Sequence, residues 1–262
     1  MTYKILFLDI DGTILKPDHT YSESTKEAIA QIKKQGIDVF IATGRPLHEI
    51  NELANELNID CFIGYNGAYA VYKNEVVLKE PMETDYVMRL LEIAKANHHE
   101  MVLYTSEKNY FTSLDHPLVR NFNESFDLTK NALFTDTVMN QILGMTVMNV
   151  PSADHASLYE LDANIRLSQV HAEGAEHAYD IIRTSMNKGV AVKKVLDYLR
   201  IPKEQSIAFG DGMNDKEMME SVGESFAMGN AHPDLFRYAK HRTTSVTDSG
   251  IFNGLKSLGL VK

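Results

Sequence analysis

Features that mark several classes of protein are scarce or missing in this sequence of 262 residues. A single cysteine, Cys61, excludes an internal disulfide, and its place in the apolar stretch "CFIG" is typical of a small core residue. No apolar run approaches the roughly 20 residues of a membrane-spanning helix. The apolar run Ile5-Leu6-Phe7-Leu8 is too short for a signal segment. We therefore expect a cytoplasmic protein without a membrane partner.

Positive charge is also scarce. The chain has 26 Lys and Arg against 36 Asp and Glu, a formal net charge of -10, which argues against broad affinity for nucleic acids or anionic membranes. Two nucleotide-binding patterns are missing as well. There is no Gly-x-x-x-x-Gly-Lys-Ser/Thr, and Gly210-Asp211-Gly212 lacks the third glycine of a dinucleotide fingerprint. The net charge still allows a small anion held in a locally basic or metal-charged pocket.

Both ends of the chain alternate apolar strand patterns with amphipathic helix patterns. Near-continuous apolar strands between such helices indicate a parallel sheet covered on both faces. The sequence therefore predicts an α/β fold with a Rossmann-like, doubly wound core. The strands are expected at 4–9, 37–42, 61–64, 206–209 and 225–228, and the helices at 24–35, from Pro46 to Leu57, at 192–199, 214–222 and 233–240.

The middle of the chain has a different pattern, with many strands and fewer helices. This composition indicates a separate α+β unit inserted into the α/β core. We place the core at 1–81 and 185–262 and the inserted unit at 82–184. Its helices are expected at 83–98, 116–125 and 153–161, and its strands at 101–105, 109–113, 141–150, 164–171 and 177–183.

Three polar clusters stand where predicted strands end. "DIDGT" at 9–13 follows the first strand, "TGR" at 43–45 follows the second, and "GDGMND" at 210–215 follows the strand at 206–209. In open α/β sheets the ligand crevice lies outside the carboxyl ends of the strands. These clusters are therefore expected to meet in one crevice. Lys188 is a fourth candidate because it precedes the helix ahead of the strand at 206–209.

The acidic side chains of these clusters would repel each other in one crevice: they are Asp9, Asp11, Asp211 and Asp215. Two unit charges about 4 Å apart interact by roughly 4 kcal/mol at an effective dielectric constant near 20. Several such pairs call for a cation. Oxygen ligands without histidine or cysteine favour Mg²⁺ over zinc.

The other groups favour a phosphoryl ligand. Lys188 offers a positive charge and Thr43 a hydroxyl, while Gly12 and Gly44 allow backbone N–H groups to approach an anion. An aspartate carboxylate can act as a nucleophile and form an aspartyl-phosphate. A second carboxylate two residues further on can protonate the leaving oxygen and then activate water.

At these positions the sequence resembles the haloacid-dehalogenase-like superfamily of phosphohydrolases, in the branch of the Cof-type phosphatases. "DIDGT" matches the first motif of that family, DxDGT, and "ATGR" matches the second with Thr43. Lys188 in "NKG" matches the third motif, and "GDGMND" matches the fourth, GDxxND. The stretch "AMGNA" at 227–231 also resembles the family's usual sequence after the fourth motif.

The resemblance implies a role for each matching residue. Asp9 would be the nucleophile and a Mg²⁺ ligand. Asp11 would be the general acid and base, and would bind Mg²⁺ through its backbone carbonyl. Asp211 would be the third protein ligand, and Asp215 would hold Lys188 or a metal-bound water. The groups expected to hold the phosphoryl group are the Ile10 N–H, Thr43, Gly44, Lys188 and Asn214.

The same resemblance implies that residues 82–184 form an α/β cap that recognises the leaving group. No motif in this region identifies the substrate, so phosphates of sugars, polyols, nucleotides and vitamin precursors stay open, as does the oligomeric state. Two further residues are candidates for substrate contact. Arg45 could bind substrate at the rim of the site or pair with Glu49, and His171 lies in a glycine-containing loop of the cap.

The leading hypothesis is a Mg²⁺-dependent phosphatase that hydrolyses phosphomonoesters of small, sugar-phosphate-like metabolites through an aspartyl-phosphate. A phosphomutase would use the same core chemistry and stays an alternative. A non-enzymatic phosphate acceptor is disfavoured, because Asp11 would provide a base beside the acyl phosphate and a cap of about a hundred residues suggests a closed small-molecule site.

Overall fold

The computed structural model describes residues 2–170, 175 and 177–262, and these form two compact units. The first unit comprises Met1–Arg45, Asn51–Leu78 and Asn187–Lys262. The second comprises Lys79–Met186 together with the short segment Pro46–Ile50. The chain passes from the first unit to the second between Leu78 and Lys79 and returns between Met186 and Asn187. The assignment of Pro46–Ile50 to the second unit was not expected.

The first unit contains a mostly parallel sheet. Its strands are β1 (Ile5–Leu8), β2 (Asp38–Ala42), β3 (Cys61–Gly64), β4 (Tyr69–Tyr72), β5 (Glu75–Lys79), β12 (Ser206–Gly210), β13 (Glu224–Ala227) and β14 (His241–Arg242). Their order in the sheet is β14-β13-β12-β1-β2-β3-β4-β5. All residues of β1 and β12 are buried, as expected for central strands covered on both faces. The α/β class predicted from the sequence is confirmed.

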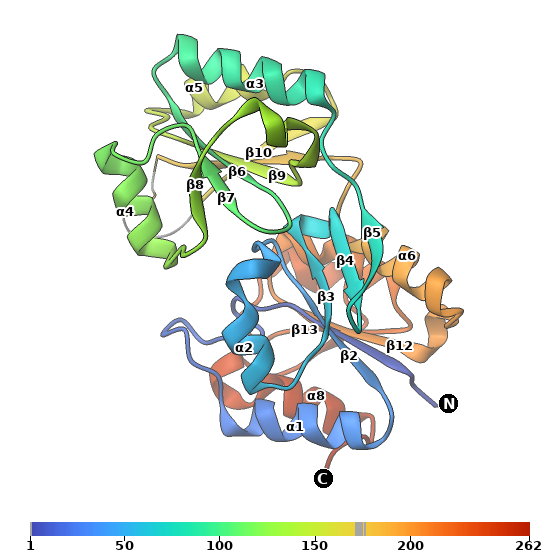
Figure 1. Ribbon diagram of the computed structural model, residues 1–262. Helices are drawn as coiled ribbons and strands as arrows, with labels where there is room; N and C mark the ends of the chain where they lie inside the picture. The colour runs from blue at the N-terminus through green and yellow to red at the C-terminus, as the bar shows by residue number, and fades with distance from the viewer. Residues whose placement is uncertain (1, 171–174, 176) are drawn as a thin grey trace. The chain divides into compact units, whose positions relative to one another are not determined.

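The helices of the first unit pack in two groups. They are α1 (Glu23–Lys34), α2 (Asn51–Glu56), α6 (Lys188–Leu199), α7 (Lys216–Ser221) and α8 (Gly250–Ser257). Helix α1 packs beside α8 (Figure 1). Helix α6 packs beside α7. The chain runs from β1 to β2 in one direction across the sheet and from β12 to β13 in the other. The strand order therefore reverses between β1 and β12, which is where α/β sheets place their ligand crevice.

The second unit is an α+β fold built on a mostly antiparallel sheet. Its strands are β6 (Glu100–Tyr104), β7 (Asn109–Phe111), β8 (Asn131–Leu133), β9 (Gly144–Met148), β10 (Ile165–Gln169) and β11 (Tyr179–Arg183), in the order β10-β11-β9-β6-β7-β8. Helices α3 (Thr84–Ala96) and α5 (Ala153–Ala156) cover one face (Figure 1). Helix α4 (Pro117–Phe126) packs on the other face, against Val102, Phe111 and Met148.

Several elements differ from those expected. The helix predicted from Pro46 to Leu57 is split into a 3-10 turn at Leu47–Glu49 and the short α2, because the turn packs with the second unit. The region predicted to be helical at 233–240 is a 3-10 turn at Pro233–Arg237. The hairpin β4–β5 was not expected; its two-residue loop has positive φ at Lys73 and Asn74, the geometry of a type I′ turn.

Other small elements were not expected either. Strands β8 and β14 have three and two residues, too short for a periodic pattern. Among the described residues, no helix is both long enough and apolar enough to cross a membrane.

Candidate active site

The candidate site is built around the end of β1, in the middle of the sheet of the first unit. Asp9 directly follows β1, and its N–H donates to the carbonyl of Phe209 over 3.1 Å. This pairing leaves the Asp9 side chain at the carboxyl end of the sheet, with only 7% of the residue exposed. The carbonyl of Ile10 accepts hydrogen bonds from Ile14 and Leu15, so the chain turns immediately after the nucleophile candidate.

Lys188 is fully buried and lies between two carboxylates. Its Nζ is 2.5 Å from Oδ1 of Asp9 and 2.6 Å from Oδ1 of Asp215. Lys188 is the first residue of α6, whose N-cap is Asn187. Gly67 allows this helix end to approach, because a Cβ atom at Gly67 would collide with the Asn187 carbonyl.

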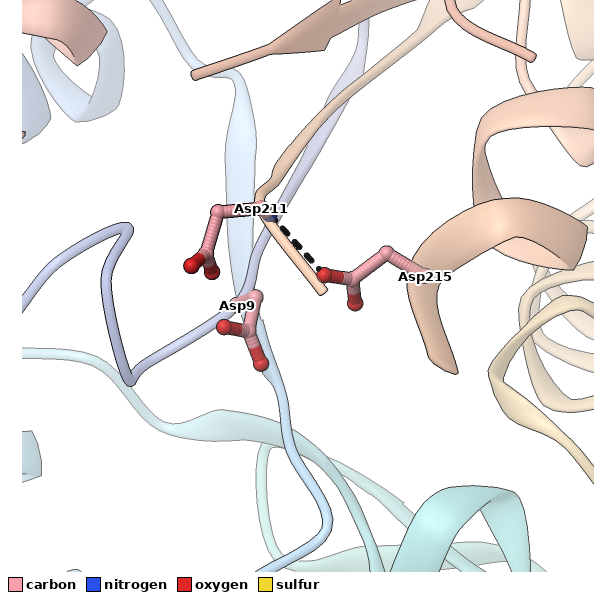
Figure 2. A group of neighbouring side chains, drawn as sticks. All are labelled: Asp9, Asp211 and Asp215. Carbon is pink, nitrogen blue, oxygen red and sulfur yellow. Dashed lines mark hydrogen bonds between the residues drawn. The ribbon is translucent and has the colours of Figure 1, made fainter. Parts of the chain in front are cut away.

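Asp215 organises the loop that follows β12. Its Oδ2 accepts hydrogen bonds from the backbone N–H groups of Asp211 and Gly212 over 3.1 and 3.0 Å, and Figure 2 shows the first of these. Its Oδ1 accepts from Lys188. Asp215 is fully buried and both of its oxygens are engaged. It is therefore suited to fixing the loop and the lysine, and less suited to binding a ligand.

Asp211 is held beside the turn that follows Asp9. The Thr13 hydroxyl donates to its Oδ1 over 3.2 Å, and the Asn230 amide donates to its Oδ2 over 3.4 Å. Asn230 also donates to the carbonyl of Gly12 over 2.8 Å. Gly12 has a φ of 77°, and a Cβ atom there would collide with the Asp211 carboxylate. The glycine of "DIDGT" thus allows the first and fourth motifs to meet.

Burial and like charge dominate the ionisation of the site. Burial raises the pKa of the Asp9 carboxyl well above its ordinary value; Lys188 opposes this rise, and Asp215 and Asp211 add to it. Burial and the charge of Asp215 raise the pKa of Asp211 from 3.8 to about 7. Burial alone would lower the pKa of Lys188, but Asp215 and Asp9 outweigh it and raise that pKa. Lys188 therefore stays positively charged. Its single charge does not balance the negative charges of Asp9, Asp211 and Asp215.

The residues of this site fit a Mg²⁺ ion. Asp9, Asp211 and Asp215 each offer an oxygen, and these oxygens lie within 4.8 Å of one another. The raised pKa values of Asp9 and Asp211 report an excess of buried negative charge that a dication would relieve. Because Asp215 is engaged with backbone N–H groups and Lys188, Asp9 and Asp211 are the carboxylates that would hold the ion. Two carboxylates, water and a phosphate oxygen are the usual surroundings of Mg²⁺.

Hydrogen-bond donors lie on three loops that follow strands of this sheet. The hydroxyl oxygen of Thr43 accepts the N–H of Arg45 over 3.0 Å, which leaves the hydroxyl hydrogen for a ligand. In the ranges that the structure describes, no backbone carbonyl accepts the N–H of Ile10. The Asn214 amide donates to Oδ1 of Asn66 over 3.3 Å. The structure therefore brings together donors from the loops after β1, β2 and β12.

Asp11 and Arg45 form an ion pair at the edge of the site. Nε and Nη2 of Arg45 lie 2.9 and 2.5 Å from the two oxygens of Asp11, which is a bidentate contact. The sequence suggested Glu49 as a partner of Arg45, but Glu49 accepts hydrogen bonds from Asn109 and Thr129. The side chain of Asp11 is 55% exposed, so the surrounding residues leave it room to reorient.

Two site residues, Asn66 and Asn230, were not predicted individually from the sequence, although Asn230 lies in the stretch "AMGNA". Asn66 has a φ of 52°, donates its N–H to the Thr43 carbonyl, and fills the space next to Gly44. Asn230 links Gly12 and Asp211, as described above. Both are amides in turns, where asparagine is common for reasons of backbone conformation alone. His171, the proposed substrate contact in the second unit, lies outside the described residues.

Comparisons with known proteins agree with this fold and site. The sequence profile of the haloacid dehalogenase-like hydrolases matches residues 6–255. The chain is 34% identical to YkrA of Bacillus subtilis over 100% of both chains. The name of YkrA describes it as an inferred phosphatase. It is 32% identical to the B. subtilis 5-amino-6-(5-phospho-D-ribitylamino)uracil phosphatase YitU, over 96% of both chains. A crystal structure of a hypothetical protein from Geobacillus kaustophilus superposes with a TM-score of 0.89 at 31% identity, covering 99% of this chain and 100% of the other.

This chain belongs to the haloacid dehalogenase-like hydrolases. Within that family it is a phosphatase of the Cof type, as its motifs and its phosphatase relatives agree. The resemblance noted in the sequence is therefore confirmed, and so is the expectation of an enzyme that acts on phosphoric monoesters.

The raised pKa of Asp211 predicts how metal and pH act on stability. A carboxyl group whose pKa is about 7 when folded and 3.8 when unfolded stabilises the fold at low pH, and this contribution is lost as the pH rises through 7. Added Mg²⁺ should therefore raise the melting temperature more at about pH 8 than at about pH 5, where it must displace a proton.

Thermal unfolding with EDTA or with Mg²⁺ across this pH range measures the effect. The variant Asp211→Asn is the control and should lose most of the Mg²⁺-dependent shift. A shift that is equal at both pH values, or larger at the lower one, would contradict the assignment.

Proposed function

We propose that this protein is a Mg²⁺-dependent phosphatase that hydrolyses phosphomonoesters of small, sugar-like metabolites through an aspartyl-phosphate on Asp9. The observation that carries the proposal is the carboxylate of Asp9, held by buried Lys188 at the end of β1. Asp11 follows two residues later with an exposed carboxylate. A nucleophile and a proton carrier therefore stand at one sheet edge, in a polar crevice with donors for a phosphoryl group.

In the first step an Asp9 oxygen attacks phosphorus while the bond from phosphorus to the leaving oxygen breaks. Asp11, in its protonated form, gives its proton to that oxygen, so the alcohol leaves uncharged. Lys188 and the N–H of Ile10 donate to phosphoryl oxygens and stabilise the charge that develops on them. Bound Mg²⁺ would supply further neutralisation of charge between the carboxylate and the phosphate.

In the second step Asp11 acts as a base. It takes a proton from a water molecule as that water attacks phosphorus, and the bond from phosphorus to Asp9 breaks. Inorganic phosphate leaves and the Asp9 carboxylate is restored. The bidentate contact with Arg45 must open for Asp11 to carry a proton, because that contact engages both carboxylate oxygens. Arg45 is therefore proposed to release Asp11 when a substrate binds.

The second unit is proposed to be the cap that recognises the leaving group. Its length and α+β architecture suit this role, and the relative YitU has a name that describes a phosphate on a ribityl chain. A polyhydroxylated monophosphate is therefore the substrate class that we propose.

A cytoplasmic location is part of the proposal. Cys61 is buried, and burial raises the pKa of its thiol to about 12, as expected for an unreactive core cysteine.

A turnover screen with Mg²⁺ tests the proposal. The panel contains an aryl phosphate, pentitol and hexose monophosphates, a nucleoside monophosphate and phosphorylated vitamin precursors. We expect release of inorganic phosphate, with the highest kcat/KM on a polyhydroxylated monophosphate. Conversion of a hexose phosphate into an isomeric sugar phosphate without phosphate release would instead support the phosphomutase alternative. Absence of turnover on every compound would contradict both.

A further inference from the structure

A polar row crosses the face of the second unit's sheet that α3 and α5 do not cover. Val102, Thr146 and Asp180 are paired in register across β6, β9 and β11, so their side chains lie on the same face. Tyr104, two residues after Val102, also lies on this face. Helix α4 packs against the Val102 end of the face, where Phe111 and Met148 lie. The row of Tyr104, Thr146 and Asp180 is the polar part of this surface.

The three side chains form a directed hydrogen-bond relay. The hydroxyl of Thr146 donates to Oδ1 of Asp180 over 2.6 Å. The phenolic oxygen of Tyr104 lies 3.0 Å from the same Thr146 hydroxyl. Because the single hydrogen of Thr146 points to Asp180, Tyr104 is the donor to Thr146. The relay thus runs from the Tyr104 hydroxyl to the Thr146 hydroxyl and from there to the Asp180 carboxylate.

Asp180 is an unusual residue for this place. Aspartate is depleted in strands, and burying a carboxylate without a cation is unfavourable. Burial raises the pKa of Asp180, and the Thr146 hydroxyl opposes this rise; no cation contributes among the described residues. Among those residues, Thr146 is also the one donor to Asp180. The relay therefore fixes the carboxylate in place and leaves its second oxygen able to accept further hydrogen bonds.

The same sheet face contacts the chain that follows the second motif. Asn109 pairs in register with Tyr104, so both side chains lie on this face. Asn109 is fully buried; its Oδ1 is hydrogen-bonded to Nε2 of His48 over 2.8 Å, and its Nδ2 donates to Glu49 over 2.6 Å. His48 and Glu49 follow Arg45 within four residues. The polar row therefore shares a sheet face with Asn109, whose side chain contacts the segment that follows the second motif.

We propose that Asp180, oriented by Thr146 and Tyr104, determines specificity by accepting hydrogen bonds from the hydroxyl groups of an uncharged, polyhydroxylated leaving group. This inference rests on the proposed phosphatase function. A fixed carboxylate gains from hydroxyl donors and repels a second phosphate or a carboxylate on the substrate. The enzyme should accordingly prefer sugar or polyol monophosphates to bisphosphates and to phosphorylated sugar acids.

The variant Asp180→Asn tests this assignment, because asparagine still accepts the hydrogen bond of Thr146. The readout is the ratio of kcat/KM for a pentitol or hexose monophosphate to kcat/KM for an aryl phosphate, whose leaving group has no sugar hydroxyls. We expect this ratio to fall about 10- to 100-fold, as for the loss of hydrogen bonds to a charged group. The preference over a hexose bisphosphate should also shrink. The melting temperature should stay equal or rise, because a partly buried charge is removed.

Asp154→Asn is the matched control: the same exchange at an exposed position in α5 of the same unit. It should leave both ratios unchanged. An unchanged ratio in Asp180→Asn, or equal losses on all substrates together with a lower melting temperature, would overturn the assignment while leaving the phosphatase function standing. If the wild-type protein with Mg²⁺ releases no phosphate from any of these compounds, the proposed function fails and this inference fails with it.

Discussion

Replacing Asp9 with asparagine is expected to abolish turnover of an aryl phosphate. Asparagine has the size of aspartate but is no nucleophile, so the covalent step cannot begin. Loss of a nucleophile typically lowers kcat by about 10⁴-fold or more. The measurement is release of the aryl alcohol under saturating substrate and Mg²⁺. Because burial and the charges of Asp215 and Asp211 raise the pKa of Asp9, and because Lys188 keeps Asp215 as a partner, the neutral replacement should not lower the melting temperature.

Asp197→Asn provides the matched control for this experiment. Asp197 is exposed on α6 of the same unit, so the same exchange should leave kcat within about twofold of the wild type. Turnover of Asp9→Asn within tenfold of the wild type would show that the nucleophile lies elsewhere.

Replacing Lys188 with methionine is expected to impair both stability and catalysis. Removing one partner from a buried ion pair typically costs about 3–5 kcal/mol, because a charge is left uncompensated. Here two carboxylates, Asp9 and Asp215, would lose the same partner. Without Lys188 the pKa of Asp9 would rise further, so the loss of stability should be larger at about pH 8 than at about pH 5. Loss of the lysine's charge toward the phosphoryl group should lower kcat by roughly 10²- to 10³-fold.

The matched control is Lys193→Met, at an exposed position of the same helix. Urea unfolding at the two pH values measures stability, and aryl phosphate turnover measures catalysis. We expect Lys193→Met to change stability by less than about 0.5 kcal/mol at both pH values. If Lys188→Met were as stable as this control, the ion pairs around Lys188 would contribute nothing to the fold.

The residues at strand ends were predictable from the sequence because each ends an unbroken apolar run. The strand rule places "DIDGT", "TGR" and "GDGMND" at one edge of a parallel sheet, and the structure has all three at the carboxyl ends of β1, β2 and β12. Lys188 was predictable from its motif alone. Its burial between Asp9 and Asp215 depends on side chains 179 and 27 residues away in sequence.

Other contacts had no local signal in the sequence. The pairing of Arg45 with Asp11 joins two loops, whereas the sequence offered Glu49 one helical turn away. That turn is 3-10 and not α-helical, because Glu49 is held by Asn109 and Thr129 in the second unit. Tertiary contacts therefore override the local helix pattern at Leu47–Glu49. The relay that ends at Asp180 was equally hidden, since its members lie on three strands that are separated in sequence.

The central claim is that Asp9 carries the phosphoryl group during turnover. In the variant Asp11→Asn the first step can proceed with an aryl phosphate, whose leaving group needs little protonation, while the second step lacks its base. Rapid quenching in acid followed by peptide mass spectrometry measures the intermediate directly. We expect a phosphoryl group on the peptide that contains Asp9, in an amount close to that of the enzyme. An unmodified Asp9 peptide alongside steady phosphate release would contradict it.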